Sequence, residues 1–215
     1  MPETPPNLAR VIKQTRQNPK VLDALFSAVS SATARERFGA AKRLRDISQH
    51  APDLLYPRFD FFVDLMESEN RILRWNAILI LGNLAAADEQ RRIDRLLDQY
   101  LGALAGPHLI DAANTIRGAT AIALARPDLA GRIARDILQV EHARYETAEC
   151  RNVAAGHAIT ALEQLFPLVA NQRAVHLFVS RQRENRRPAT RHKAEKFLRK
   201  WPIDQRAQAG GSHLF

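Results

Sequence analysis

Apolar residues recur at intervals of three and four positions along most of the chain, and no segment shows sustained apolar–polar alternation. A spacing of three to four places apolar side chains on one face of a helix, whereas a half-buried strand has a period of two. Alanine and leucine, both strong helix formers, contribute 59 of the 215 residues. The pattern therefore predicts an all-α fold.

Prolines and capping residues divide this pattern into helical segments. Proline is tolerated in the first turn of a helix, where its missing N–H costs no hydrogen bond, and it precedes or opens expected helices at Pro19, Pro52, Pro107, Pro127 and Pro188. Thr33 and Glu36 have the spacing of a capping box, and Asp88, Thr147 and Asn171 are further expected N-caps. The segments form five pairs: 19–31 with 33–50, 52–68 with 69–87, 88–104 with 106–125, 127–145 with 147–166, and 171–184 with 188–201.

A short motif recurs in the second segment of the pairs. An arginine, an alanine three residues later and an apolar residue four further on occur at Arg37/Ala40/Leu44, Arg74/Ala77/Leu81, Arg151/Ala154/Ala158 and Arg191/Ala194/Leu198. The central pair has Leu109 in place of the arginine, followed by Ala112 and Ile116. Successive alanines are then 37, 35, 42 and 40 residues apart. Such a period is typical of stacked helix pairs that share one core.

The repeat length, the helix pairs and the Arg-x-x-Ala-x-x-x-Leu pattern resemble the HEAT-repeat (armadillo-like) family over residues 19–201. The resemblance implies a right-handed α-solenoid of about five HEAT-like antiparallel helix pairs, whose second helices line a concave groove. We expect an irregular segment and a lead-in helix in residues 1–18, the solenoid domain in 19–201, and a flexible polar tail in 202–215.

Polar side chains interrupt the apolar runs of the three central second helices. They form either a hydrogen-bonding stripe along the groove or the solvent-facing side of amphipathic helices. In the second interpretation, Arg74 and Arg151 are repeat residues that tie adjacent turns together. The candidate groove residues are Arg74, Asn76, Asn83, Asp111, Asn114, Arg117, Arg151, Asn152 and His157.

One glycine lies within each central second helix, at Gly82, Gly118 and Gly156. A glycine inside a helix costs about 1 kcal/mol relative to alanine. Close contact between neighbouring repeats compensates for this cost, and so does a ligand lying against exposed backbone. We favour close packing as the explanation.

A dense basic cluster lies near the C-terminus. It serves either as the polar cap of the last repeat or as a surface for an anionic partner such as the phosphates of a nucleic acid. Its members are Arg181, Arg183, Arg186, Arg187, Arg191, Lys193, Lys196, Arg199 and Lys200.

The formal net charge of +9 is unevenly distributed. Residues 1–50 carry 9 basic and 4 acidic side chains, residues 51–150 carry 11 and 15, and residues 151–215 carry 12 and 4. Both ends are basic and the middle is mildly acidic. This distribution argues against a continuous phosphate-binding track through the middle of the chain.

The sequence contains no recognisable catalytic or metal-binding motif, so we expect no cofactor, no metal and no enzymatic activity. DNA glycosylases of the HEAT-like kind use tryptophans and an aspartate at the lesion, but the counterparts Trp75, Trp201 and Asp111 lie in different repeats and match no local motif. The single cysteine, Cys150, permits no internal disulfide. No signal peptide or membrane span is recognised, so a cytoplasmic location is expected.

These observations predict a non-catalytic scaffold that captures a protein or peptide partner in its concave groove. The alternative is a nucleic-acid-binding module that uses the basic terminal repeats. For that alternative, the first repeat supplies Arg35, Arg37, Lys42, Arg43 and Arg45. The sequence leaves the identity of the partner and the oligomeric state open.

Overall fold

The chain folds into a succession of helices joined by short turns. The computed structural model describes residues 5–202, and this part of the chain contains no strand. The prediction of an all-α fold is therefore confirmed. The first four residues, and all but the first residue of the tail expected at 202–215, lie outside the described residues.

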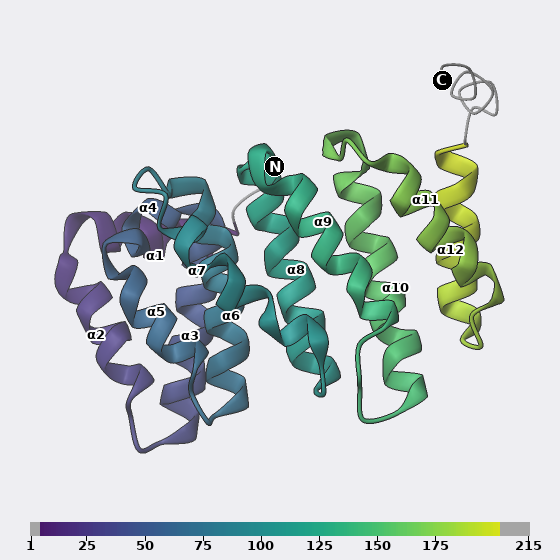
Figure 1. Cartoon of the computed structure of the whole chain (residues 1–215). Coiled ribbons are helices and arrows are strands. Elements are labelled where there is room, and N and C mark those ends of the chain that lie inside the picture. The colour runs from purple at the N-terminus through teal and green to yellow at the C-terminus, as the bar shows by residue number, and fades with distance from the viewer. Residues whose placement is uncertain (1–4, 203–215) are drawn as a thin grey trace.

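Five helices lie side by side in chain order, and we call them row A (Figure 1). Each row A helix packs against the next one along the chain. The members of row A are α3 (Ala34–His50), α6 (Arg71–Leu84), α8 (Leu109–Ala125), α10 (Ala148–Leu165) and α12 (Pro188–Lys200).

A second set of helices, row B, packs against row A. The members of row B are α2 (Pro19–Val29), α5 (Phe59–Met66), α7 (Arg92–Leu101), α9 (Ala130–Leu138) and α11 (Gln172–Arg181). Short helical segments extend both rows: α4 (Pro52–Leu55), η1 (Tyr56–Arg58), η2 (Ala85–Ala87), η3 (Gly102–Ala105), η4 (Pro127–Leu129), η5 (Gln139–Glu141), η6 (Phe166–Leu168) and η7 (Gln182–Glu184). Helix α1 (Pro6–Gln17) packs on α2 as the expected lead-in helix. Each of the ten predicted segments contains one helix of row A or row B.

Three of the four predicted caps bind the start of a helix. Thr147 accepts a hydrogen bond from the backbone N–H of Cys150 at 3.1 Å, and Asn171 accepts one from Ala174 at 3.1 Å. Asp88 accepts two from the first residues of α7. The capping box predicted at Thr33 and Glu36 is wrong, because Glu36 instead accepts a hydrogen bond from the hydroxyl of Ser31 at 2.6 Å.

The motif alanines point into the core that the two rows share. The core is one apolar cluster that extends from Phe26 in α2 to Phe197 in α12. A small side chain at each motif position lets neighbouring helices approach closely. The motif alanines Ala40, Ala77, Ala112, Ala154 and Ala194 are all buried.

The glycines of the three central row A helices also lie where helices touch. A Cβ atom added to Gly82 would lie 2.7 Å from the Cα of Gly118 on the next helix. One added to Gly118 would overlap the hydroxyl of Tyr100, and one added to Gly156 would lie 2.9 Å from Oγ1 of Thr190. The glycines therefore serve close packing, as we expected.

Candidate binding groove

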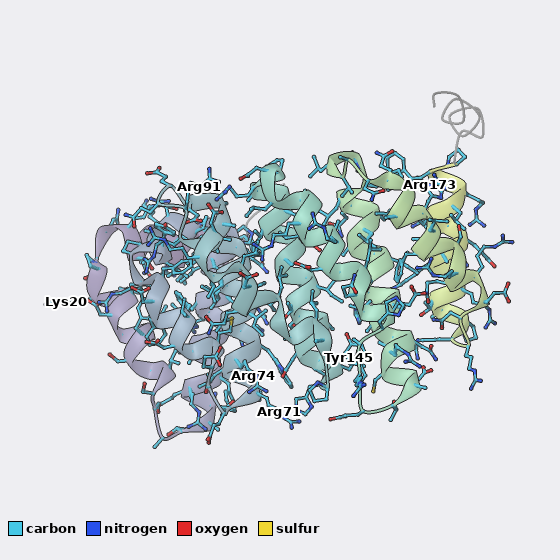
Figure 2. The ribbon with its side chains drawn as sticks, in the orientation of Figure 1. Lys20, Arg71, Arg74, Arg91, Tyr145 and Arg173 are labelled. Atoms are coloured by element: carbon cyan, nitrogen blue, oxygen red, sulfur yellow. The ribbon has the colours of Figure 1, made fainter. Side chains whose placement is uncertain are left out.

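The repeat arginines hold the turns that lead into row A helices. Three of the four donate a hydrogen bond to a backbone carbonyl six residues earlier in the chain. The bonds run from Arg37 to Ser31 (3.1 Å), from Arg74 to Ser68 (2.9 Å) and from Arg191 to Asn185 (2.9 Å). Figure 2 shows Arg74 on the edge of the molecule where these turns lie, with Arg91 and Arg173 on the opposite edge. These three arginines thus have a structural role within their own helix pairs.

Arg74 and Asp111 also join neighbouring row A helices. Their ion pair, at 3.0 Å, connects α6 with α8, and the indole N–H of Trp75 donates to the same carboxylate. Trp201 lies at the end of α12, with its ring 4.8 Å from that of Phe166. The structure therefore brings Trp75 and Asp111 together, as part of the helix packing, and places Trp201 elsewhere.

An open groove crosses four consecutive row A helices, α3, α6, α8 and α10. Its volume is about 490 Å³, and Leu79, Ile116 and Leu124 contribute apolar surface to its lining. Four of the nine candidate groove residues line it: Asn83, Asn114, Arg117 and His157. Gln49, Thr160 and Gln164 add further polar groups. We call this feature the row A groove.

The amides in the row A groove are fixed in position by neighbouring groups. Asn83 donates from Nδ2 to the hydroxyl of Ser48 at 2.9 Å, and Asn114 donates from Nδ2 to the carbonyl of Ile110 at 3.0 Å. Their Oδ1 atoms accept no hydrogen bond from the described residues. The groove therefore presents oriented acceptors beside an apolar surface.

Positive charge gathers at the α10 end of the groove. Lys193 of α12 extends toward α10 and donates to the carbonyl of Gly156 at 3.0 Å, next to His157. Burial lowers the pKa of His157, and the nearby charges of Lys193 and Arg187 lower it further. Burial and the charge of Arg187 likewise lower the pKa of Lys193. Two basic groups are thus held close together, and Lys193 is partly buried.

The other candidate groove residues lie elsewhere. Asn76 is only 7% exposed, because α6 is packed between α3 and α8. Its amide donates to the carbonyl of Ile72. Asn152 donates to Glu149 at 3.2 Å near the start of α10. Arg151 lines a separate hollow of about 390 Å³ beside the turn at 142–147. These three residues do not contribute to the row A groove.

More than half of the predicted basic cluster is bound within the protein. Arg181 pairs with Glu141 at 2.6 Å, Lys200 pairs with Glu163 at 3.0 Å, and Arg187 pairs with Glu149. With Arg191 and Lys193 bonded to backbone carbonyls, five of the nine residues stabilise the last helix pair. The remaining four, Arg183, Arg186, Lys196 and Arg199, make no ion pair with the described residues.

Row B carries a series of ion pairs that sequence reasoning missed. Each pair joins an acidic residue to an arginine 32 to 40 positions further along the chain. The pairs are Asp23 with Arg58, Asp60 with Arg92, Asp98 with Arg132 and Glu141 with Arg181. The signal in the sequence is the separation between each acidic residue and its arginine, which is close to the length of one repeat.

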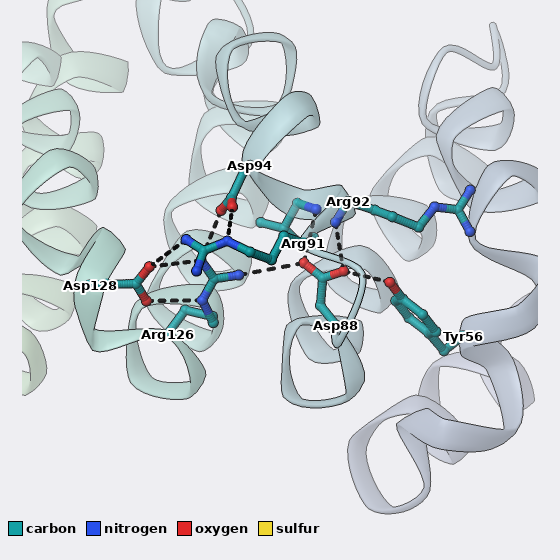
Figure 3. Close-up of polar contacts among 8 residues, drawn as sticks. Tyr56, Asp88, Arg91, Arg92, Asp94, Arg126 and Asp128 are labelled. Atoms are coloured by element: carbon teal, nitrogen blue, oxygen red, sulfur yellow. Dashed lines mark hydrogen bonds and ion pairs between the residues drawn. The ribbon is translucent and has the colours of Figure 1, made fainter.

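Asp88 forms the centre of a polar network at the turns between helix pairs (Figure 3). Its carboxylate accepts hydrogen bonds from the hydroxyl of Tyr56 at 2.6 Å and from the backbone N–H groups of Arg92 and Ile93 at 2.8 and 2.9 Å. Burial raises the pKa of Tyr56 to about 12, and the Asp88 carboxylate acts in the same direction. The guanidinium of Arg126 lies 3.6 Å from the same carboxylate.

Arg126 extends this network across two further turns. It pairs with Asp94 at 2.9 Å and with Asp128 at 2.7 Å, and Arg91 contacts both carboxylates (Figure 3). Hydrogen bonds from Arg126 lower the pKa of Asp128 to about 2. Burial alone would raise the pKa of Asp94, but hydrogen bonds from Arg91 and Arg126 bring it below its ordinary value. The network links three successive helix pairs.

No protein-family model matches the sequence, and comparison with curated proteins finds no significant match. Within residues 5–202, no group of three or more His, Cys, Asp or Glu side chains is arranged to hold a metal ion. None of the helices described here combines the length and the apolar character that crossing a membrane requires. The row A groove is therefore the feature on which a functional proposal rests.

Proposed function

We propose that the chain is a right-handed α-solenoid of five HEAT-like helix pairs and acts as a non-catalytic binding module. In this proposal, the row A groove captures a segment of a partner protein. The solenoid assignment is supported by the order of contacts along row A, by the recurring arginine-to-turn hydrogen bonds, and by ion pairs at one-repeat separation.

The difference between the two rows favours a concave row A. Its helices approach to backbone contact at Gly82 and Gly118, whereas row B neighbours are joined through long side chains. When one row of a stack is spaced more closely than the other, the stack curves toward the closer row. The groove then lies on the inner surface, as in other helical-repeat proteins.

The single observation that carries the functional proposal is the continuous groove over four row A helices. Side-chain amides offer both donors and acceptors, as a peptide backbone requires, and the apolar surface accommodates side chains. Because Asn83 and Asn114 are held by hydrogen bonds within the protein, binding a partner segment needs little ordering of the receptor.

Filling the row A groove is expected to weaken the capture of peptides. We propose selecting binders from a random-peptide display library and measuring their affinity for the Ala121→Trp variant, since Ala121 lines the groove. The indole occupies the space a peptide needs, so affinity should fall about tenfold or more, which corresponds to about 1.4 kcal/mol.

The matched control is Ala24→Trp, which adds the same side chain at an exposed position on row B. It should bind the selected peptides as the wild type does. Leu124→Asp, at an exposed position of the groove lining, supplies a second disruptive variant, and thermal unfolding checks that all variants fold. Equal affinity in all of these variants would exclude the groove.

The nucleic-acid alternative rests on Arg183, Arg186, Lys196 and Arg199, which make no ion pair with the described residues. This alternative predicts binding of duplex DNA or structured RNA that weakens steeply with salt. Titration at two salt concentrations, with Lys196→Glu/Arg199→Glu as the variant, tests it. Absence of binding at the lower salt concentration would eliminate the alternative.

A further inference from the structure

We propose that the segment captured by the row A groove is acidic, and that one of its carboxylates is bound among Arg117, His157 and Lys193. This inference rests on the proposed function, because it names the chemistry of the partner for the same groove. It concerns the α10 end of the groove, where α8 and α12 pack on opposite sides of α10.

The lining of the row A groove contains Arg117 and His157 but, among the described residues, no carboxylate. The acidic residues of α8 and α10 are already paired within the protein. They are Asp111 with Arg74, Glu149 with Arg187, and Glu163 with Lys200. No acidic side chain of these two helices is therefore left to neutralise the groove.

Lys193 adds an uncompensated charge at the same end. Its ammonium group is partly buried, bonds to the carbonyl of Gly156, and makes no ion pair within residues 5–202. Arg117 of α8 and Lys193 of α12 lie on the two helices that flank α10, which carries His157. An incoming carboxylate would relieve the repulsion between His157 and Lys193 and would accept charge-assisted hydrogen bonds.

The shape of the groove favours an acidic peptide over a nucleic acid. The basic groups of the lining lie on α8 and α10, whereas α3 and α6 contribute Gln49, Leu79 and Asn83 and no charge. A phosphate backbone needs positive charge along its whole length, while a peptide places a single carboxylate beside apolar neighbours. The charge pattern therefore complements a short acidic and apolar segment.

Carboxylate binding should also couple affinity to pH. In the free protein, burial and the charges of Lys193 and Arg187 lower the pKa of His157. A bound carboxylate favours the protonated imidazole and so raises that pKa. The complex then takes up a proton, and affinity should increase as the pH falls from 8 to 6.

The first experiment compares the composition of a random-peptide display library before and after selection on the wild-type protein. The inference predicts enrichment of aspartate and glutamate among the selected peptides. Selection of neutral or basic peptides would overturn it and leave the proposed function intact. Recovery of no peptide by the folded protein would instead contradict the proposed function itself.

The second experiment is a double-mutant cycle on a selected acidic peptide. Arg117→Gln and Lys193→Met should each weaken its binding about tenfold, whereas the peptide with asparagine in place of aspartate should bind wild type and variants equally. Arg95→Gln removes a charge from an exposed position of row B and should leave affinity unchanged. His157→Gln should abolish the increase between pH 8 and pH 6.

Competition separates a specific carboxylate site from general attraction of anions. A single-stranded DNA oligonucleotide should not displace the acidic peptide at matched total charge. Displacement by the oligonucleotide, or equal weakening of the acidic and neutral peptides by Lys193→Met, would overturn the inference.

Discussion

Replacing Gly82 with alanine will lower the free energy of unfolding by about 1–2 kcal/mol. The new Cβ would lie 2.7 Å from both the Cα and the carbonyl oxygen of Gly118, and neither backbone atom can move without separating α6 from α8. Overpacking of this kind typically costs about 1–3 kcal/mol and outweighs the gain of about 1 kcal/mol in helix propensity. Urea-induced unfolding followed by circular dichroism measures the change.

Gly39→Ala provides the matched control. Gly39 lies within α3, and a Cβ added there would meet no atom within 4 Å. The same substitution should therefore raise stability by up to about 1 kcal/mol, since only helix propensity changes. Equal effects at the two glycines would contradict the close contact between α6 and α8.

Removing the carboxylate of Asp88 will also destabilise the protein strongly, by about 3–5 kcal/mol. The side chain is fully buried, and Asp88→Ala leaves the hydroxyl of Tyr56 and two backbone N–H groups without their acceptor. It also removes one of the three carboxylates that pair with Arg126. Breaking a buried charged network costs this much because the remaining groups stay desolvated. Chemical denaturation again provides the measurement.

Asp60→Ala is the control for loss of a carboxylate. The Asp60 side chain is 83% exposed and, within residues 5–202, pairs only with Arg92, so its removal should change stability by about 0.5 kcal/mol or less. A spectroscopic titration of Tyr56 adds a second readout, because Asp88→Asn removes the charge that helps raise its pKa to about 12. An unchanged tyrosine titration would show that Asp88 does not act on Tyr56.

Local signals were sufficient to predict the helices. The apolar spacing, the prolines and the buried motif alanines each depend on residues within one or two turns of a helix. The failure at Thr33 has a local cause, since Ser31 accepts a hydrogen bond from the backbone N–H of Thr33 and donates to Glu36. The hydroxyls of Ser31 and Thr33 both lie close to Glu36 in the sequence. The capping-box motif does not indicate which of the two interacts with it.

Charge was harder to interpret, because a count along the chain combines both faces of every helix. The middle of the chain is mildly acidic, but Asp60 and Asp98 lie on row B and pair with arginines of the next repeat. Their carboxylates therefore contribute nothing to the row A groove. Recognising this required the pairing of residues more than 30 positions apart, which only the fold specifies.

Sequence reasoning located part of the candidate site. Asn114 and Arg117 line the groove because they lie three residues apart on one face of α8. Asn76 lies two helical turns before Asn83 on α6, yet neighbouring helices bury it. Lys193 was assigned to the basic cluster, since nothing in its own helix indicates that it reaches the backbone of α10.

The unequal joining of the two rows has a mechanical consequence. Backbone contacts at van der Waals distance resist both stretching and compression, whereas an arginine and a carboxylate on flexible side chains can separate by several ångströms. Salt weakens such exposed pairs further. The molecule should therefore be stiff along row A and compliant along row B, so that it bends most easily about an axis near the groove. Such bending would let the width of the row A groove adjust to partner segments of different thickness.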